Sequence, residues 1–143
     1  LHYWRTHPEA ANQPAEEIVK QLIAVGKVMT PALEAVITNH IDSRTPIVLE
    51  GDFILPMLAT SPSFSKNSTN SQIQALFLYE ESEEQLRQNF LQREPEQGIR
   101  EKRARVSWLY GQWLKEEAER VGALALPARP WNDLFERILK VRK

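Results

Sequence analysis

The chain has 143 residues, of which 42% are hydrophobic, which is enough for one domain with a core and too few for two. Its 18 basic and 19 acidic side chains leave a net charge of -1, so no overall field attracts nucleic acid or an anionic membrane. The chain has no cysteine, which excludes disulfides, thiolate zinc sites and cysteine nucleophiles. No apolar run approaches the roughly 20 residues of a membrane span. We therefore expect a cytoplasmic protein with no nucleic-acid and no membrane partner.

The first third of the chain is predicted to be helical. Residues 1–13 are rich in aromatic and His residues but have no clean period, and we assign them no fixed structure. Pro14 is a favourable first helical residue, and apolar spacing after it predicts a helix over 14–28. A threonine before Pro31 is a second start signal. The region up to residue 42 is thus either two helices or one helix broken at the proline.

Three short apolar runs predict strands. The run 47–53, Ile-Val-Leu-Glu-Gly-Asp-Phe, follows a proline and predicts a buried strand. Ser, Asn and Thr dominate 61–71, which predicts a mobile loop. The runs 73–79 and 124–126 predict the second and third strands.

Helices separate and follow these strands. A capping box that begins at Ser82 predicts a helix after the second strand. A long helix is expected over 99–121, with Gly122 as its C-terminal stop, and a last helix over 131–141. Strands separated by helices predict an α/β fold with a parallel sheet that is covered on both faces. Three strands are few for this much helix, so either the sheet is minimal or a part of it is missing.

An acidic pair stands at the end of the first predicted strand. Glu50 and Asp52 are two residues apart, so in a strand they project to the same side, at the edge where open α/β sheets bind ligands. Mg²⁺ prefers such oxygen ligands, and one carboxylate is also suited to take a proton from an attacking hydroxyl. Alternatively, Glu50 is satisfied by neighbouring backbone and Asp52 caps a turn.

A basic segment follows the second strand. Its guanidinium groups suit bidentate contacts to phosphate, as a closing lid over a triphosphate requires, and the Pro95–Gly98 break would provide the hinge. Interleaved glutamates favour the alternative of a solvated charged face. The basic residues are Arg93, Arg100, Lys102, Arg103 and Arg105.

A third group follows the last strand. A purine base would fit against the indole of Trp131 or the plane of Arg129, with a hydrogen bond from Asn132. Alternatively, the indole is a core anchor and the asparagine caps the final helix. The three histidines are too scattered to predict a metal site.

The order of these motifs resembles the C-terminal two-thirds of P-loop small-molecule kinases, in the group of phosphoglycerate-, gluconate- and zeta-toxin-like kinases. The resemblance covers nearly the whole chain, and it depends on the order of the motifs more than on any one of them. The motifs are Val48-Leu-Glu-Gly-Asp52, Leu76-Phe-Leu-Tyr79, the segment Arg93 to Arg105, Trp108-Leu-Tyr-Gly-Gln-Trp113 and Ala128-Arg-Pro-Trp131.

The resemblance implies a three-layer P-loop-NTPase-like sheet and ATP- and Mg²⁺-dependent phosphoryl transfer to a hydroxyl of a small molecule. It implies one domain, with an acceptor-binding flap over 1–45 and the sheet, lid and C-terminal helix over 46–143. Asp52 would be the metal-linked or base carboxylate, and Glu50 its support. The lid would come from Arg93, Arg100 and Arg103; the nucleotide would contact Arg105, Arg129, Trp131 and Asn132; and the acceptor would contact Tyr3, Arg5 and His40.

The chain departs from this family at its start. Such kinases begin with a strand, a glycine-rich phosphate loop with its lysine, and a helix; the 143 residues contain no Gly-x-x-x-x-Gly-Lys-Ser/Thr loop. In the usual strand order the absent strand lies between 47–53 and 73–79. Either these two strands close on each other, or another chain fills the gap, or an N-terminal portion is missing from these 143 residues, which is the outcome we expect. The first residue is Leu1, not Met, which suggests a processed, trimmed or incomplete chain. Without the phosphate loop, we expect the 143 residues alone to have no catalytic activity or very weak activity. An alternative is a non-catalytic binding or assembly module that self-associates or is completed by a partner chain.

Overall fold

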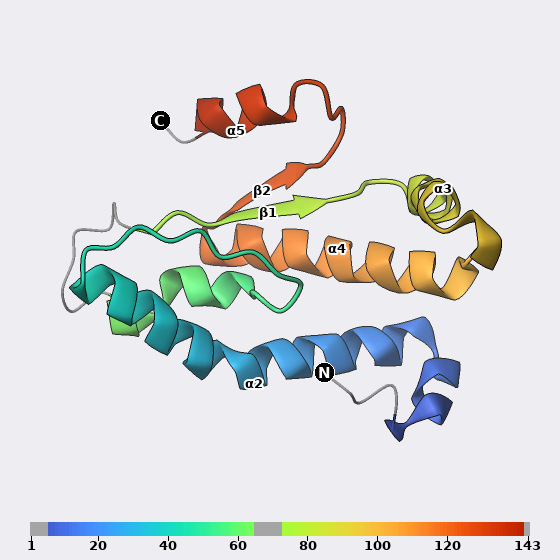
Figure 1. Ribbon diagram of the computed structural model, residues 1–143, viewed down its shortest axis with the longest axis horizontal. Helices are drawn as coiled ribbons and strands as arrows, with labels where there is room; N and C mark the ends of the chain where they lie inside the picture. Colours follow the sequence, from blue (N-terminus) through green and yellow to red (C-terminus); the bar gives the residue numbers. More distant parts are fainter. Residues whose placement is uncertain (1–5, 65–72, 142–143) are drawn as a thin grey trace.

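The structure is a computed structural model that describes residues 6–64 and 73–141 (Figure 1). The described residues are mostly helical, and their regular β-structure consists of two short strands. The α-helices are α2 (Ala15–Asp42), α3 (Glu83–Arg93), α4 (Glu101–Val121) and α5 (Leu134–Val141), and the strands are β1 (Leu76–Tyr79) and β2 (Leu124–Pro127). Short 3-10 helices are η1 (Pro8–Asn12), η2 (Pro56–Thr60), η3 (Pro62–Phe64) and η4 (Pro95–Gln97).

The core lies between α2, α4 and η2. The two long helices lie side by side and run in the same direction (Figure 1). Val19 of α2, Tyr110 of α4 and Leu55, just before η2, are buried together. The side chain of Leu55 is completely buried, which contributes roughly 2 kcal/mol relative to an exposed leucine. Partly buried apolar side chains surround this cluster: Leu22, Ile23, Met57, Val106, Leu109, Trp113 and Leu114.

The helix α2 is continuous through Pro31, so the predicted pair of helices over 14–28 and 31–42 is wrong as two separate elements. Proline lacks an N–H and crowds the preceding turn, which ordinarily kinks a helix. The hydroxyl of Thr30 donates to the carbonyl of Gly26 at 2.9 Å within this turn. Figure 1 shows that α2 changes direction about halfway along its length. Packing against α4 thus holds one bent helix where local propensity alone predicts a break.

By length and composition, α2 is apolar enough to cross a membrane, contrary to the expectation that no segment is. A core helix of a soluble protein meets the same criterion, so this is weak evidence. In the structure one side of α2 packs on α4, with Ile18, Val19 and Gly26 buried.

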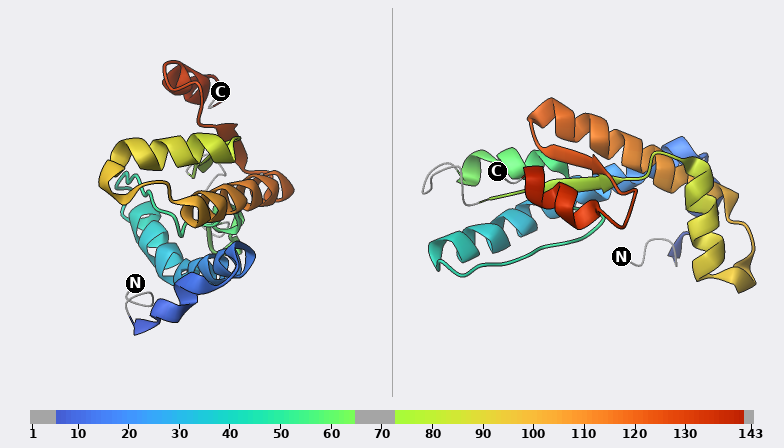
Figure 2. Two further views of the ribbon diagram at one scale, coloured as in Figure 1. Left: turned by 90° about the vertical axis from the view of Figure 1, so that its right-hand side faces the viewer. Right: turned by 90° about the horizontal axis from the view of Figure 1, so that it is seen from above.

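The sheet consists of β1 and β2, which pair in parallel with Leu76 opposite Leu124 and Tyr79 opposite Pro127. α4 covers one face of this sheet, and α5 projects away from the end of β2 (Figures 1 and 2). The strands predicted over 73–79 and 124–126 are therefore confirmed in position, although β1 is shorter than the predicted run 73–79.

The predicted three-layer sheet is wrong. The run 47–53 forms no strand, because no described segment pairs with its backbone, and Val48 is 93% exposed. A strand needs a neighbour that satisfies its N–H and C=O groups, and a short apolar run does not by itself supply that neighbour. The residues run extended beside β1 and in the same direction, as Figures 1 and 2 show, and then turn at Gly51 into η2.

The predicted helix ends around the sheet are largely confirmed. The Ser82 hydroxyl accepts a hydrogen bond from the N–H of Gln85 at the start of α3. Gly122 ends α4 with φ of 74°, a left-handed conformation that glycine adopts without steric cost. In the predicted loop over 61–71, Pro62–Phe64 forms η3 with Phe64 buried, and residues 65–72 lie outside the described residues.

We predict opposite effects of alanine at two buried helical glycines. A Cβ at Gly26 would lie 2.7 to 2.9 Å from three side-chain carbons of Leu55, which has no room to move, so Gly26→Ala should lower the free energy of unfolding by about 1–3 kcal/mol. At Gly111 the nearest atom is the Cβ of Tyr79 at 3.7 Å, so Gly111→Ala should raise it by up to about 1 kcal/mol through helix propensity. Urea denaturation of both variants measures the difference, and equal effects would contradict the close packing of α2 on Leu55.

Candidate functional site

The acidic pair is positioned through the backbone. Glu50 and Asp52 are exposed, and neither carboxylate makes an ion pair with a described residue. The carbonyl of Asp52 accepts a hydrogen bond from the hydroxyl of Tyr110 in α4, and the N–H of Ile54 donates to the carbonyl of Gly51 at 3.3 Å. The turn is therefore tied to the core while both carboxylates stay available to solvent or to a ligand. Among the described residues, the alternative in which neighbouring backbone satisfies Glu50 and the Asp52 side chain caps a turn is wrong.

Tyr110 remains a donor over the whole physiological range. Burial raises the pKa of its hydroxyl to about 12, and the negative charge of Asp52 adds to this effect. The ring also stacks on Trp113 at 6.0 Å between centroids. The tie between α4 and the acidic turn is thus built into the core.

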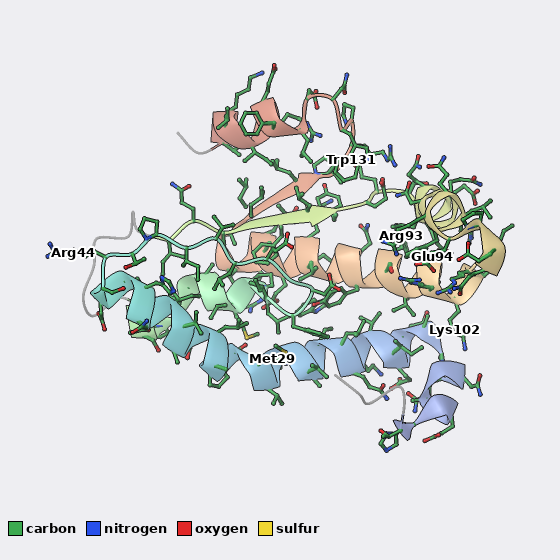
Figure 3. The ribbon with its side chains drawn as sticks, in the orientation of Figure 1. Met29, Arg44, Arg93, Glu94, Lys102 and Trp131 are labelled. Atoms are coloured by element: carbon green, nitrogen blue, oxygen red, sulfur yellow. The ribbon has the colours of Figure 1, made fainter. Side chains whose placement is uncertain are left out.

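Three of the predicted lid arginines converge on one carboxylate. Glu94 lies 3.1 Å from Arg103, 3.2 Å from Arg100 and 3.5 Å from Arg93. The guanidinium groups of Arg103 and Arg93 also lie over the Phe90 ring, at 4.4 and 5.4 Å from its centroid. Figure 3 shows Arg93 and Glu94 at the end of α3. Three positive charges on one negative charge leave a local excess that suits an anion.

Arg105 serves a different purpose. Its guanidinium lies 3.0 Å from Glu83 of α3 and 3.7 Å from Glu16 of α2, and 5.1 Å from the ring centroid of Trp108. These contacts tie three helices together. In this structure, the residue predicted to bind nucleotide is engaged in structural pairs.

Arg129 lies at the C-terminal edge of the two strands. It donates to Glu80 at 3.0 Å and to Asn89 at 2.8 Å, and its guanidinium lies 5.7 Å from the ring centroid of Trp131. Trp131 is 56% exposed, so the prediction of a core anchor is wrong and the indole face remains open to a ligand. Asn132 is exposed in the turn two residues before α5, where it does not cap the helix.

The acidic turn and the arginine cluster share one side of α4. Tyr110, which holds Asp52, follows Arg103 by seven residues, so the two lie two helical turns apart, roughly 10 Å along the axis. Neither of the two cavities described in this section is lined by Glu50, Asp52 or any of the predicted lid arginines. Tyr3 and Arg5 lie outside the described residues.

Among residues 6–64 and 73–141, no three His, Asp or Glu side chains gather as a ready metal-ligand group. Mg²⁺ is commonly held by one or two carboxylates together with water and substrate phosphates. Asp52, with Glu50 beside it, fits that limited requirement, and its exposure leaves room for the other ligands.

The larger cavity is an apolar groove of about 550 Å³ between the extended segment 46–50 and the start of β1. One wall includes Ile47 and Leu49, and the other includes Ile73, Ala75 and Phe77. The floor comes from α2 and η2. The remaining lining residues are Ile37, His40, Ile41, Arg44, Thr45, Pro46, Ile54, Leu55, Leu58, Ala59 and Gln74.

Both walls of the groove present unpaired backbone. β1 pairs with β2 along one edge, and no described segment pairs with its other edge. Likewise, residues 46–50 make no backbone hydrogen bond to another described residue. The short apolar runs carried this signal in the sequence, but pairing alone decides whether such runs close on each other. Among the described residues they do not pair, so the alternative in which 47–53 and 73–79 close on each other is wrong.

A second cavity, of about 510 Å³, lies between α2 and α4, where Lys20, Lys27 and Arg120 face Trp113 and Glu117. Two of its cations are already paired, Lys20 with Glu17 at 2.6 Å and Arg120 with Glu117 at 2.6 Å. This cavity offers little free charge for a ligand.

The end of the groove is formed by the C-terminus of α2. The N–H of Arg44 donates to the carbonyl of Ile41, and the N–H of Thr45 donates to that of His40, which is a Schellman motif. Arg44 occupies its left-handed position with φ of 53°, where glycine or asparagine is usual. His40 donates from Nδ1 to the carbonyl of Thr45 at 3.0 Å, because a carbonyl can only accept. His40, predicted to bind the acceptor, therefore lies in the groove and away from the acidic pair.

No protein-family model matches the chain, and no curated protein and no solved structure gives a significant match. The kinase resemblance consequently stays a prediction.

We predict that Tyr110 makes stability fall at high pH. Because the folded pKa of about 12 exceeds the unfolded value of 10.0, the folded state holds the proton more tightly. The contribution is present below pH 10 and is lost as the pH rises from 10 towards 12. Urea denaturation across that range should show a shallower fall for Tyr110→Phe, which also loses the bond to Asp52, than for the unchanged chain. Parallel curves would show that Tyr110 is not the group responsible.

Proposed function

We propose that this chain is a binding module that accepts an extended segment of a partner polypeptide in the groove between residues 46–50 and β1. The observation that carries the proposal is the groove itself: residues 46–50 run extended with no backbone hydrogen bond to another described residue, and no described segment pairs with the edge of β1 that faces away from β2. A strand is the occupant that satisfies both walls at once. Its N–H and C=O groups would pair on either side, as in β-strand addition.

The side chains of the groove suit such a strand. Successive residues of a strand point to opposite faces, so alternate residues of an occupant would enter the cavity above α2. There they would meet Ile47 and Leu49, which are 40% and 36% exposed while the groove is empty. Burial of this apolar surface at roughly 25 cal/mol per Å² would add to the backbone hydrogen bonds. Backbone pairing gives affinity, and the apolar pockets select alternating sequences.

We predict that adjacent residues of the groove wall respond differently to a charge. Leu49 lines the groove, whereas Val48 points away from it and is 93% exposed. Leu49→Asp should weaken binding of a capped, neutral peptide with valine at alternate positions by about tenfold or more, since a buried unpaired carboxylate is costly. Val48→Asp is the matched control and should change binding by less than about twofold.

Fluorescence anisotropy of the labelled peptide measures both affinities. A peptide of the same composition with its valines contiguous should bind weakly, because it cannot place them on one face. Failure of the alternating peptide to bind at millimolar concentration, or equal loss in the two variants, would overturn the proposal. Sedimentation of the chain alone would show whether a second copy fills the groove instead.

A second candidate function is ATP- and Mg²⁺-dependent phosphoryl transfer to a hydroxyl of a small molecule in the cytoplasm. The observation that favours it is that Arg103 of the arginine cluster and Tyr110, which holds the acidic turn, lie on one side of α4, two helical turns or roughly 10 Å apart along its axis. In addition, the groove lies between the two runs at which the resemblance expects a further strand. Asp52 would hold Mg²⁺ or accept the hydroxyl proton, and Arg93, Arg100 and Arg103 would stabilise charge on the transferred group.

This candidate predicts weak binding of ATP that depends on Mg²⁺. Asp52→Asn should remove the gain in ATP affinity that Mg²⁺ gives, which we expect to be about tenfold. Arg103→Gln should lower ATP affinity about tenfold, both with and without the ion. Glu96→Gln is the control, because Glu96 is exposed beside the cluster and makes no ion pair with a described residue. Titration calorimetry measures all three variants. Binding that is absent, or indifferent to Mg²⁺ and to Asp52, would sink phosphoryl transfer by these residues.

A further inference from the structure

The charged side chain in the lining of the groove is Arg44, at the end formed by the C-terminus of α2, where His40 also lines the groove. The lining includes no Asp or Glu. Arg44 makes no ion pair with a described residue, and Asp42 of the same turn is not part of the lining. Figure 3 shows the Arg44 side chain extending outward at the extremity of the molecule, next to the start of the extended segment. A guanidinium without an ion-pair partner among the described residues therefore stands at the rim of this end of the groove, where a carboxylate that leaves the groove would come close to it.

The backbone of Arg44 adds a second, independent observation. Its φ of 53° is the left-handed conformation of a Schellman motif, which costs about 1 kcal/mol for a residue other than glycine or asparagine. Among the described residues, it is the non-glycine residue with positive φ. Arginine is thus the less stable choice at this position for helix termination, which points to a use for its side chain.

The opposite end of the extended segment has the opposite charge. Glu50 and Asp52 follow the groove wall, are exposed and make no ion pair with a described residue. β1 and the extended segment both run from the Arg44 end towards this acidic end (Figure 1). A polypeptide whose C-terminus meets Arg44 therefore runs antiparallel to both walls, and its preceding residues extend towards the carboxylates.

On the basis of the function proposed above, we propose that the occupant is the C-terminal tail of a partner protein. Its last residues pair antiparallel with β1, alternate apolar side chains enter the groove, and the free α-carboxylate binds Arg44 beside His40. A basic residue a few positions before the C-terminus lies next to Glu50 and Asp52. Capture of a chain-terminal carboxylate together with strand pairing gives both direction and register to an otherwise uniform apolar contact.

The test compares two peptides that differ only at the C-terminus. Both have the alternating valine sequence, and one ends in a free carboxylate while the other ends in an amide. The free acid should bind about tenfold more tightly to the unchanged chain, as a charge-assisted hydrogen bond is lost in the amide. In Arg44→Asn this difference should fall to less than about twofold, with the amide peptide bound as before. Asparagine is favourable in the left-handed conformation, so this variant should be at least as stable in urea as the unchanged chain.

The outcomes separate the two proposals. Equal affinity for acid and amide, or a preference that survives Arg44→Asn, would overturn capture of the C-terminus and leave the groove as a general strand acceptor. Failure of both peptides to bind would overturn the groove function itself. Glu50→Gln should leave the preference for the free-acid peptide intact, and it should weaken the binding of a peptide that has a lysine near its N-terminal end. A change in the preference for the free acid in this variant would contradict the antiparallel direction.

Discussion

The packing of Leu55 between α2 and α4 determines where everything else in the molecule lies. Its side chain fills the space that Gly26 leaves on α2 and contacts the buried cluster of Val19 and Tyr110. The same tyrosine holds the backbone of Asp52 three residues earlier. One buried leucine and one phenolic hydroxyl therefore fix the far end of the segment that leaves α2, and the Schellman motif at Arg44 fixes its near end. Between these two anchors the chain has no partner among the described residues.

This two-point attachment explains why an apolar run lies extended and still exposes so much surface. Each anchor holds the chain at one point, and neither supplies hydrogen bonds to the residues between them. The direction of the run, alongside β1, follows from the position of its anchors, one at the C-terminal end of α2 and the other at Tyr110 in the middle of α4. The groove is thus a consequence of the helical packing. Its polarity has the same origin, because the residue that ends α2 and the residues of the acidic turn carry opposite charges.

Local sequence signals predicted the helices well, since their evidence lies within each element. Ser82 caps α3 and Gly122 ends α4, as their chemistry requires. The sequence could not predict that α2 continues through Pro31, because contacts with α4 and η2 outweigh the local cost of proline. The strand at 47–53 was wrong for the complementary reason: an apolar run is suited to pair, and pairing depends on a neighbour that no local pattern specifies. Likewise, the role of Arg105 follows from partners far away in the sequence, Glu83 and Glu16.

The open edge of β1 has a consequence for the chain in isolation. A short row of unpaired amide and carbonyl groups beside an apolar groove can pair with any extended polypeptide, and such edges are known sources of aggregation. Val48, which faces outward, extends the exposed apolar surface beyond the groove. Neither run contains a lysine or a proline that would blunt the edge between residues 47 and 50 or between 76 and 79. Purified at high concentration without an occupant, the chain should be prone to self-association through this edge, so its solubility would report whether the groove is filled.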